Sequence, residues 1–328
     1  MPAPRVDSTP NRHAGRVVSL AAHRPAMETS EAAQLGGMAR LTPALRAVAA
    51  GSAALHAVAP ALTTEIMLRH FTQPRRRARR DYRAELPPGA YPLRLAFNNR
   101  ELAGWAWGFT GPAVLLVHGW EDHAGSMLHL VPELLARGHR VCVLDLPGHG
   151  LSPRIPTHLV DASFALEAMV RAYGPFDSIV AHSFGATATC LMLERAGALA
   201  PDRLALISPM QDIDQHLQIF ATIAGLSPPR SRLLRARVAQ TLGCPPEAVC
   251  ALQAVRALRV NALVIHDRHD PVIPHGTGKR VAGNLQGARF VSTVNLGHRR
   301  VLRCPDVVAR IVDHLGPACF NRNKREFI

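Results

Sequence analysis

Ser183, Asp270 and His298 are three residues whose side chains could act together, although they lie far apart in the sequence. A serine hydroxyl becomes a nucleophile when a histidine takes its proton, and a carboxylate keeps that histidine in the required tautomer. Each of the three follows a short apolar, β-branched run. If these runs are parallel strands, their carboxyl ends share one edge of a sheet. The sequence therefore predicts that the three side chains converge as nucleophile, acid and base.

The residues around Ser183 suit a sharp turn from a strand into a helix. Such a turn needs small neighbours, because the backbones of strand and helix pass close together there. Ala181 and Gly185 provide them, so the familiar pattern G-x-S-x-G is written A-x-S-x-G. The extra methyl group of Ala181 should be tolerated. An ordinary serine at a strand end could carry the same five residues, so the assignment depends on the rest of the constellation.

The segment VLLVHGW (114–120) supplies a second part of that constellation. It ends an apolar run in His118, Gly119 and Trp120, and in a sheet of this type the loop lies beside the nucleophile. The backbone N–H groups of Trp120 and Phe184 would then point to the same place. Two such donors form an oxyanion hole, which stabilises a tetrahedral intermediate by several kcal/mol. The alternative is that Gly119 only makes a turn.

Five segments, taken in order, resemble the motifs of the α/β-hydrolase family. They are LLVHGWEDHAGSM, VLDLPGHGLS, AHSFGA, HDRHDPVIP and LGHRRVL, and the similarity extends over about residues 92–315. The similarity is particularly close to bacterial serine hydrolases of the lysophospholipase-like and esterase-like kind. The resemblance implies Ser183 as nucleophile, His298 as base, Asp270 as acid, and the amides of Trp120 and Phe184 as oxyanion donors.

Asp267 is an alternative acid, three residues before Asp270. In the family's pattern the acid is the aspartate that precedes Val-x-Pro, and here Asp270 precedes PVIP. The resemblance therefore favours Asp270. Asp145, in LDLPGHG, is expected to be structural and to shape its turn through Gly148 and Gly150.

The elements that must position these residues alternate along the chain. Short apolar runs are separated mostly by helix-length segments such as SMLHLVPELLARG and DASFALEAMVRAYG. Continuous apolar strands indicate a mostly parallel, doubly wound sheet covered on both faces, which is an α/β fold. LRLAF and LAGWAWG, on either side of Asn98 and Asn99, predict an antiparallel hairpin before it. The predicted parallel strands are AVLLVH (113–118), RVCVLDL (140–146), SIVAH (178–182), LALIS (204–208), ALVIH (262–266) and RFVSTV (289–294).

The domain organisation follows from changes in pattern along the chain. We expect a disordered leader over residues 1–40, a helical N-terminal arm over 41–84 that Pro60 bends or splits, and an α/β-hydrolase domain over 85–318. Roughly fifty residues separate two predicted strands, which is too long for a simple connection, so residues 211–256 should form a small helical cap. Residues 319–328 should form a basic tail.

The charge is strongly basic, with 38 Lys and Arg against 24 Asp and Glu. No nucleic-acid-binding module accompanies it and aromatic residues are scarce, so we expect no nucleic-acid partner. The helical arm could pack on the hydrolase domain, form a dimer, or touch an anionic membrane surface through the arginines of residues 75–80. The sequence leaves the oligomeric state open.

Several features favour a cytoplasmic protein. The six cysteines are scattered without paired spacing, which suits a reducing compartment. The first twenty residues have no continuous apolar segment of the kind found in secretory signals, and the Ala-rich stretch 48–67 is too polar to predict a membrane span.

No cofactor or metal is expected. Residues 266–270 contain two histidines and two aspartates and could be mistaken for a metal site. The role of Asp270 as acid explains that residue, and the other three lie in a tight loop. HGTGKR (275–280) lacks the first glycine and the final Ser or Thr of a phosphate-binding loop, and no G-x-G-x-x-G motif follows a strand.

These observations favour a serine hydrolase that cleaves a carboxylic ester or thioester of a small-molecule acyl substrate through an acyl-enzyme. One alternative is an acyltransferase that uses the same three residues with an acceptor other than water. Another is a non-catalytic binding protein on the same fold. No motif in the predicted cap indicates the acyl chain or the leaving group.

Overall fold

The structure is a computed structural model that describes residues 58–75 and 81–317 of the 328-residue chain. The predictions for the leader, for the arginines of residues 76–80 and for the tail at 319–328 lie outside the described residues. Within the described ranges, no helix is both long enough and apolar enough to cross a membrane.

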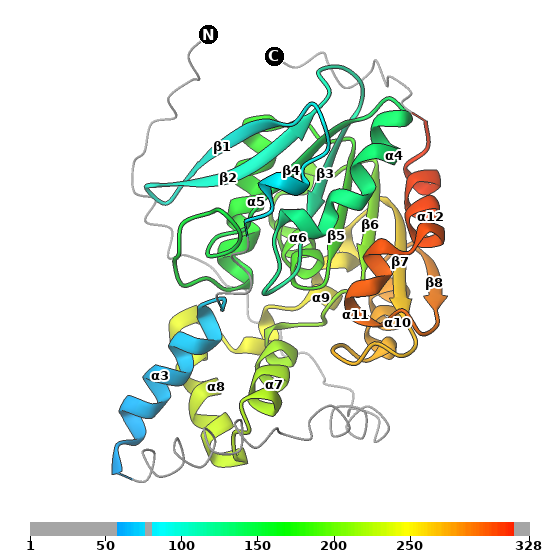
Figure 1. Cartoon of the computed structure of the whole chain (residues 1–328). Coiled ribbons are helices and arrows are strands. Elements are labelled where there is room, and N and C mark those ends of the chain that lie inside the picture. Colours follow the sequence, from blue (N-terminus) through cyan, green and yellow to red (C-terminus); the bar gives the residue numbers. More distant parts are fainter. Residues whose placement is uncertain (1–57, 76–80, 318–328) are drawn as a thin grey trace.

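One eight-stranded sheet forms the centre of the molecule, with strand order β1-β2-β4-β3-β5-β6-β7-β8 (Figure 1). β2 pairs antiparallel with β1 and β4, and all other neighbours are parallel. The predicted mostly parallel α/β fold is therefore confirmed. The strands are β1 (Tyr91–Phe97), β2 (Arg100–Trp107), β3 (Ala113–Val117), β4 (Arg140–Leu144), β5 (Ser178–His182), β6 (Arg203–Ile207), β7 (Asn261–Asp267) and β8 (Arg289–Thr293).

The predicted hairpin is formed by β1 and β2. Phe97 pairs with Arg100 across a two-residue loop, and the loop residues Asn98 and Asn99 have φ of 48° and 56°. Two consecutive left-handed residues make the type of turn whose twist matches an antiparallel pair, and asparagine tolerates that conformation better than other residues with a side chain. The two asparagines therefore explain the register of the hairpin.

Helices cover both faces of the sheet (Figure 1). In β3, Leu115 and Val117 belong to one buried cluster while Val114 and Leu116 belong to the other, which is why the strand is apolar throughout. One face is covered by η3 (Ala124–Leu130), α4 (Val131–Ala136), η7 (Val301–Arg303) and α12 (Pro305–Leu315), and the other by α5 (Leu159–Tyr173), α6 (Phe184–Arg195), α9 (Ala251–Ala254) and α10 (His275–Asn284).

A helical cap lies beyond one end of the sheet, at the lower left of Figure 1. The connection between β6 and β7 forms α7 (Ile213–Ile223) and α8 (Pro228–Leu242) before it returns to the sheet. This is the insertion that the long connection predicted. The remaining short elements are η2 (Arg83–Glu85), η4 (Gly197–Leu199), η5 (Pro246–Ala248), η6 (Val255–Ala257) and α11 (Gly297–Arg300).

The N-terminal helix α3 (Pro60–Thr72) packs against α8 and so extends the cap (Figure 1). It begins at Pro60, a residue that suits the first turn because the amide there needs no intrahelical acceptor. Near its end, the Phe71 ring lies 4.9 Å from that of His216 and 5.5 Å from that of Phe220, centroid to centroid. The described part of the predicted arm therefore packs on the cap, and contact with a membrane surface stays a prediction.

The order in which successive strands are added to the sheet reverses at β3, because β4 lies on one side of β3 and β5 on the other. In sheets of this kind, the loops after two neighbouring strands separate at such a point and leave a crevice at their carboxyl ends. The loop after β3 begins at His118, and the turn after β5 contains Ser183. The topology thus places the two segments singled out by the sequence side by side.

Candidate active site

Ser183 occupies a strained turn between β5 and α6. Its φ of 53° and ψ of −120° lie in a region that residues with a side chain rarely adopt. The Ser183 amide donates to the carbonyl of Ile207 on β6 at 2.8 Å, so the neighbouring strand stabilises the turn. Only 4% of the residue is exposed. The serine is therefore presented at the sheet edge by a backbone conformation that the surrounding structure imposes.

Gly185 explains why small residues surround this serine. A Cβ atom at Gly185 would lie 2.2 Å from the carbonyl oxygen of His118, and one at Gly119 would lie 3.1 Å from Cβ of Ser183. The loop after β3 and the turn after β5 are therefore in contact through two glycines. Ala181 is completely buried, so its extra methyl group is accommodated.

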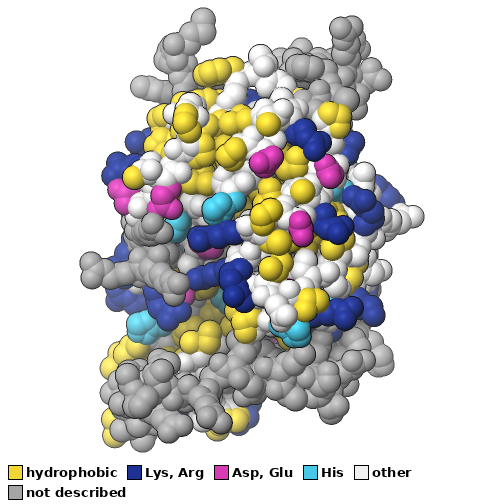
Figure 2. Space-filling view, turned by 45° about the vertical axis from the view of Figure 1, so that its right-hand side comes forward, with side chains coloured by type: hydrophobic (Ala, Val, Ile, Leu, Met, Phe, Trp, Pro, Cys, Tyr) yellow, Lys and Arg dark blue, Asp and Glu magenta, His cyan; other side chains and the backbone are white. Residues whose placement is uncertain are grey.

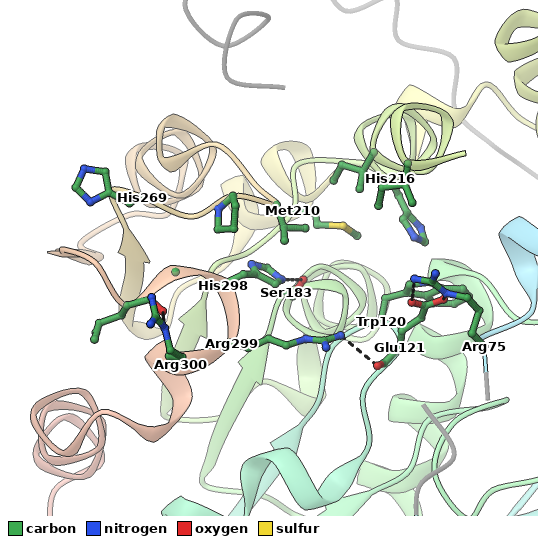
Figure 3. Close-up of a pocket in the computed structure, with 16 residues that line it drawn as sticks. Arg75, Trp120, Glu121, Ser183, Met210, His216, His269, His298, Arg299 and Arg300 are labelled. Atoms are coloured by element: carbon green, nitrogen blue, oxygen red, sulfur yellow. Dashed lines mark hydrogen bonds and ion pairs between the residues drawn. The ribbon is translucent and has the colours of Figure 1, made fainter. Parts of the chain in front are cut away.

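The structure brings Ser183, His298 and Asp270 together, and Figure 3 shows the first two of them. Nε2 of His298 lies 3.0 Å from Oγ of Ser183, and Nδ1 lies 2.7 Å from Oδ2 of Asp270. The carboxylate can only accept, so Nδ1 carries a proton and Nε2 is free to accept the serine proton. The three residues thus form one chain of hydrogen bonds, as the sequence predicted.

Asp270 is held as a carboxylate with one oxygen turned toward His298. Its side chain is fully buried, and Oδ1 accepts the amides of Val272 and Ile273 at 2.8 and 2.9 Å. Burial opposes ionisation, but the neighbouring His298 and the hydrogen bonds from His266 and His298 outweigh it and hold the pKa of Asp270 well below its ordinary value. Asp270 is consequently charged at neutral pH.

Asp267, the alternative acid, has a different position. Oδ1 accepts the amide of His269, while Oδ2 accepts the Thr293 hydroxyl at 2.8 Å and the Leu296 amide at 3.0 Å. These hydrogen bonds tie the loop after β7 to β8 and to the segment that leads to His298. The geometry therefore assigns Asp267 a structural place and leaves Asp270 as the partner of His298.

His182 supports the loop that carries His298, a function that the sequence did not reveal. It is almost completely buried, and its Nε2 lies 2.9 Å from the carbonyl oxygen of His298. Burial and the neighbouring His298 lower the pKa of His182 well below its ordinary value, so the ring is neutral. Nε2 then carries the ring proton and donates a hydrogen bond to this carbonyl, which holds the backbone of His298 in place.

His118 orients the amide of Trp120. The Leu146 amide donates to Nε2 of His118 at 3.0 Å, so the ring proton is on Nδ1, which donates to the carbonyl of Gly119 at 2.8 Å. The C=O and N–H of one peptide unit point in opposite directions. The Trp120 N–H is therefore turned away from the His118 ring.

Phe184 provides the second predicted donor. It is the first residue of α6, where the backbone N–H has no acceptor within the helix. Within the described parts of the chain, neither the Phe184 amide nor the Trp120 amide donates to a protein acceptor. Both predicted donors are thus unused by the fold.

Glu121 follows Trp120 in an unusual conformation, with φ of 52°. Its amide donates to Nε2 of His149 at 3.2 Å, its carbonyl accepts from Arg299 at 3.2 Å, and its carboxylate pairs with Arg75. Three segments distant in sequence therefore determine the backbone path of the loop after Trp120. None of these contacts could be read from the motifs, since each joins residues at least 28 positions apart.

A cavity of about 490 Å³ opens above Ser183, between the sheet edge and the cap (Figure 3). Most of its wall is apolar, and arginines occupy its mouth. Among residues 58–75 and 81–317, no cluster of His, Cys, Asp or Glu could hold a metal ion. The lining residues are Arg75, Trp120, Glu121, Ser183, Met210, His216, Ile219, Ile223, His269, Pro271, Val272, Leu296, Gly297, His298, Arg299 and Arg300.

His216, on α7 of the cap, is the polar residue in the apolar wall of this cavity. Its ring lies 5.0 Å from that of Trp120 and 5.6 Å from that of Phe184, centroid to centroid. Burial lowers the pKa of His216 to about 4. The imidazole is therefore neutral at pH 7 and belongs to the aromatic cluster that joins the cap to the loop after β3.

Asp145 lies away from Ser183 and serves the fold. Its carboxylate accepts from the Tyr82 hydroxyl at 2.7 Å and from the amides of Ala124 and Leu151 at 2.7 and 2.8 Å. Gly150 packs directly on it, since a Cβ there would lie 2.1 Å from the carboxyl carbon. The structural function predicted for Asp145 agrees with these contacts.

Comparisons with known proteins place the chain among hydrolases. A family model described as "Alpha/beta hydrolase family" matches residues 114–311. The chain is 28% identical to a pimeloyl-[acyl-carrier protein] methyl ester esterase of Chromobacterium violaceum over 246 residues, which is 66% of this chain and 92% of that protein. It is 37% identical to a serine hydrolase-like protein of Danio rerio over 128 residues, which is 36% of this chain and only 35% of that protein.

Solved structures show the same fold. One is the 2-hydroxy-6-oxo-6-phenylhexa-2,4-dienoate hydrolase from Rhodococcus sp. strain RHA1, which is 18% identical to this chain with a TM-score of 0.52. The match covers 69% of this chain and 98% of that one. At this identity the likeness concerns the fold alone.

Proposed function

The chain belongs to the alpha/beta hydrolase family, and we propose that it is a serine hydrolase that cleaves a carboxylic ester or thioester through an acyl-enzyme on Ser183. The observation that carries this proposal is the continuous chain of hydrogen bonds from Ser183 through His298 to Asp270. The esterase name of the C. violaceum relative, which aligns over nearly its whole length, supports an ester as the substrate.

In the first step, Oγ of Ser183 attacks the carbonyl carbon of the substrate, and its proton passes to Nε2 of His298. The Asp270 carboxylate stabilises the resulting imidazolium through Nδ1. The carbonyl oxygen becomes an oxyanion and accepts hydrogen bonds from the amides of Trp120 and Phe184. Because neither amide donates to an acceptor in the described part of the chain, both are available without reorganisation.

In the second step, the tetrahedral intermediate collapses and the bond to the leaving group breaks. His298 donates its proton to the departing alkoxide or thiolate, which leaves an ester on Ser183. A water molecule then attacks this ester, gives one proton to His298, and releases the carboxylic acid as Oγ takes that proton back. The net reaction consumes one water and restores the enzyme.

The experiment is to measure hydrolysis of p-nitrophenyl butyrate and S-butyryl-N-acetylcysteamine by the wild-type chain and by Ser183→Ala. We expect the variant to lose turnover by at least about 10⁴-fold. Ser227→Ala is the matched control, because Ser227 is exposed and its side chain makes no capping hydrogen bond at the start of α8. Equal turnover in wild type and Ser183→Ala would contradict the proposal.

Product analysis in the presence of alcohols and amines distinguishes hydrolysis from acyl transfer. Release of the free acid in proportion to the leaving group supports hydrolysis. A new ester or amide as the main product would instead support the acyltransferase alternative with the same three residues.

A further inference from the structure

The mouth of the active-site cavity carries an excess of positive charge. Of the described residues that line the cavity, Arg75, Arg299 and Arg300 are cationic, and Glu121 is the one carboxylate. On the face shown in Figure 2, basic side chains occur in several separate groups with acidic ones between them.

Arg75 and Glu121 neutralise each other. Nε and one terminal nitrogen of Arg75 donate to the two carboxylate oxygens of Glu121, which is the paired geometry that guanidinium and carboxylate favour. This ion pair lies at the mouth in Figure 3. The charge of Arg75 is thus neutralised, and the surplus positive charge comes from Arg299 and Arg300.

Among the described residues, Arg299 and Arg300 donate hydrogen bonds only to uncharged carbonyl oxygens. Arg299 donates to the carbonyl of Glu121 at 3.2 Å. Arg300 donates to the carbonyls of Leu296 and Asn295, both at 3.0 Å. Within residues 58–75 and 81–317, neither guanidinium forms an ion pair with a carboxylate.

Both side chains retain donors for a ligand. A guanidinium has five N–H donors, and these carbonyls use one of those of Arg299 and two of those of Arg300. Both residues are exposed. An adjoining hollow is lined by the same two arginines and by Glu121. It also contains Asp122 and Arg303, so this additional carboxylate is accompanied by an additional cation.

We propose that the substrate carries an anionic group, a carboxylate or a phosphate, which Arg299 binds while the scissile carbonyl lies at Ser183. Arg300, whose side chain lies on the other side of His298 in Figure 3, adds positive charge to the mouth of the cavity. Guanidinium groups match both anions in charge and geometry. The apolar wall formed by residues such as Met210, Ile219 and Val272 would take the hydrocarbon part. This inference rests on the proposed function, since it describes the substrate of the same site.

The position of Arg299 and Arg300 gives the inference its geometry. They follow His298 directly in the sequence, so the same short helix α11 carries the base and both cations. In Figure 3 the Arg299 side chain extends from beside His298 toward the loop of Trp120 and Glu121. An anionic group bound there would orient the substrate relative to the nucleophile rather than merely attract it to the surface.

The test uses two pairs of substrates that differ in charge. The first pair is p-nitrophenyl hexanoate and the mono-p-nitrophenyl ester of adipic acid, which place a methyl group or a carboxylate at the end of a six-carbon acyl chain. The second pair is S-butyryl-N-acetylcysteamine and butyryl-coenzyme A, which differ by the phosphates on the thiol side. The pairs thus distinguish an anion on the acyl part from one on the leaving group.

The quantity measured is the ratio of kcat/KM for the anionic substrate to kcat/KM for its neutral partner. We expect Arg299→Gln to lower this ratio about tenfold in one of the two pairs, the change expected from losing a hydrogen bond to a charged group. Arg300→Gln should lower the ratio in the same pair by a smaller factor, because it removes a nearby charge and no direct hydrogen bond. Because the ratio compares two substrates on one protein, partial damage to the site cancels. Lysine at either position should retain part of the ratio, since the charge remains.

Arg310→Gln is the matched control. Arg310 is an exposed arginine on α12 and does not line the active-site cavity. We expect its ratio to equal that of the wild type. For the wild type, raising the salt concentration from about 0.02 M to about 0.5 M should reduce the ratio, because exposed charges are screened.

The outcomes separate this inference from the proposed function. If neutral esters are hydrolysed through Ser183 but the ratio is the same in wild type, Arg299→Gln and Arg300→Gln for both pairs, the anionic substrate is contradicted and the hydrolase stands. If the wild type hydrolyses none of the four substrates, the proposed function itself is contradicted.

Discussion

The edge of the sheet and the cap contribute to one cavity but are stabilised in different ways. At the sheet edge, Ser183, Asp270 and His298 each follow a strand, and their positions are supported by hydrogen bonds with Ile207, Val272 and His182, respectively. In the cap, α7 and α8 are joined to α3 and to the loop after β3 by an aromatic cluster and by an ion pair at the surface.

This difference assigns the reaction to the sheet edge and the preference for a substrate to the cap. Buried, directional hydrogen bonds hold reacting atoms to within a fraction of an ångström, which nucleophilic catalysis requires. Apolar contacts tolerate changes of side chain more readily. We therefore expect substitutions at the sheet edge to abolish turnover and substitutions in the cap to change stability or substrate preference.

The largest effect is expected from Asp270→Asn. Asparagine can present its NH₂ group to Nδ1 of His298 and so favour the wrong tautomer, and we expect kcat to fall by about 10³- to 10⁴-fold while the fold persists. Asp267→Asn is the matched comparison. It weakens hydrogen bonds to Thr293 and Leu296, so we expect a lower melting temperature and a loss of kcat below about tenfold. Similar kcat losses in both variants would contradict the assignment of the acid.

A large effect on stability is expected from Gly185→Ala. The new methyl group would lie 2.2 Å from the carbonyl oxygen of His118, where only backbone could yield. We expect a loss of at least about 3 kcal/mol in the free energy of unfolding, or failure to obtain folded protein. Gly197→Ala is the control, because a Cβ there meets no atom within 4 Å. Unfolding in urea, followed by circular dichroism, measures both.

Acid should destabilise the cap through His216. The unfolded chain binds a proton with an ordinary histidine pKa of about 6.5, whereas the folded chain does so only near pH 4. Stability therefore rises with pH between these values, and is lost progressively as the pH falls from about 6.5 to 4, by up to ~3 kcal/mol from this residue. His216→Phe keeps an aromatic ring and should show a smaller loss between pH 7 and 4.5. Equal losses would show that His216 is not the group responsible.

The smallest effect is expected from the ion pair between Glu65 of α3 and Arg237 of α8. Both side chains are substantially exposed, at 52% and 36%. Such pairs contribute about 0 to 1 kcal/mol, so Glu65→Gln should change the free energy of unfolding by less than about 1 kcal/mol. Phe71→Ala, which removes a buried ring from the same contact between α3 and the cap, should cost about 3 kcal/mol or more. A larger effect from Glu65→Gln would indicate that charge, rather than apolar contact, attaches α3.

The sheet edge could be predicted from the sequence because its signals are local. Each of the six predicted parallel strands is present to within two residues at its ends, and the motif around Ser183 contains both the proposed nucleophile and the glycine that its turn requires. The order of Ser183, Asp270 and His298 was informative because parallel strands all end at one edge.

The remaining parts of the site depend on contacts between distant segments. His118 was visible in its motif, but its effect on the Trp120 amide depends on the Leu146 amide, which lies 28 residues further along. The surroundings of Glu121 depend on Arg75, His149 and Arg299. The place of His216 depends on how the cap folds over Ser183. Such contacts leave no periodic or local pattern in a single sequence.

The most direct test of the central claim is whether Ser183 is activated. Purified protein would be treated with a fluorophosphonate probe, and the modified residue located by mass spectrometry of its peptides. We predict one adduct, on Ser183, that is lost in Ser183→Ala and strongly reduced in His298→Ala, while Ser227→Ala reacts like the wild type. Absence of an adduct on Ser183 in folded protein, or equal labelling in His298→Ala, would contradict the account.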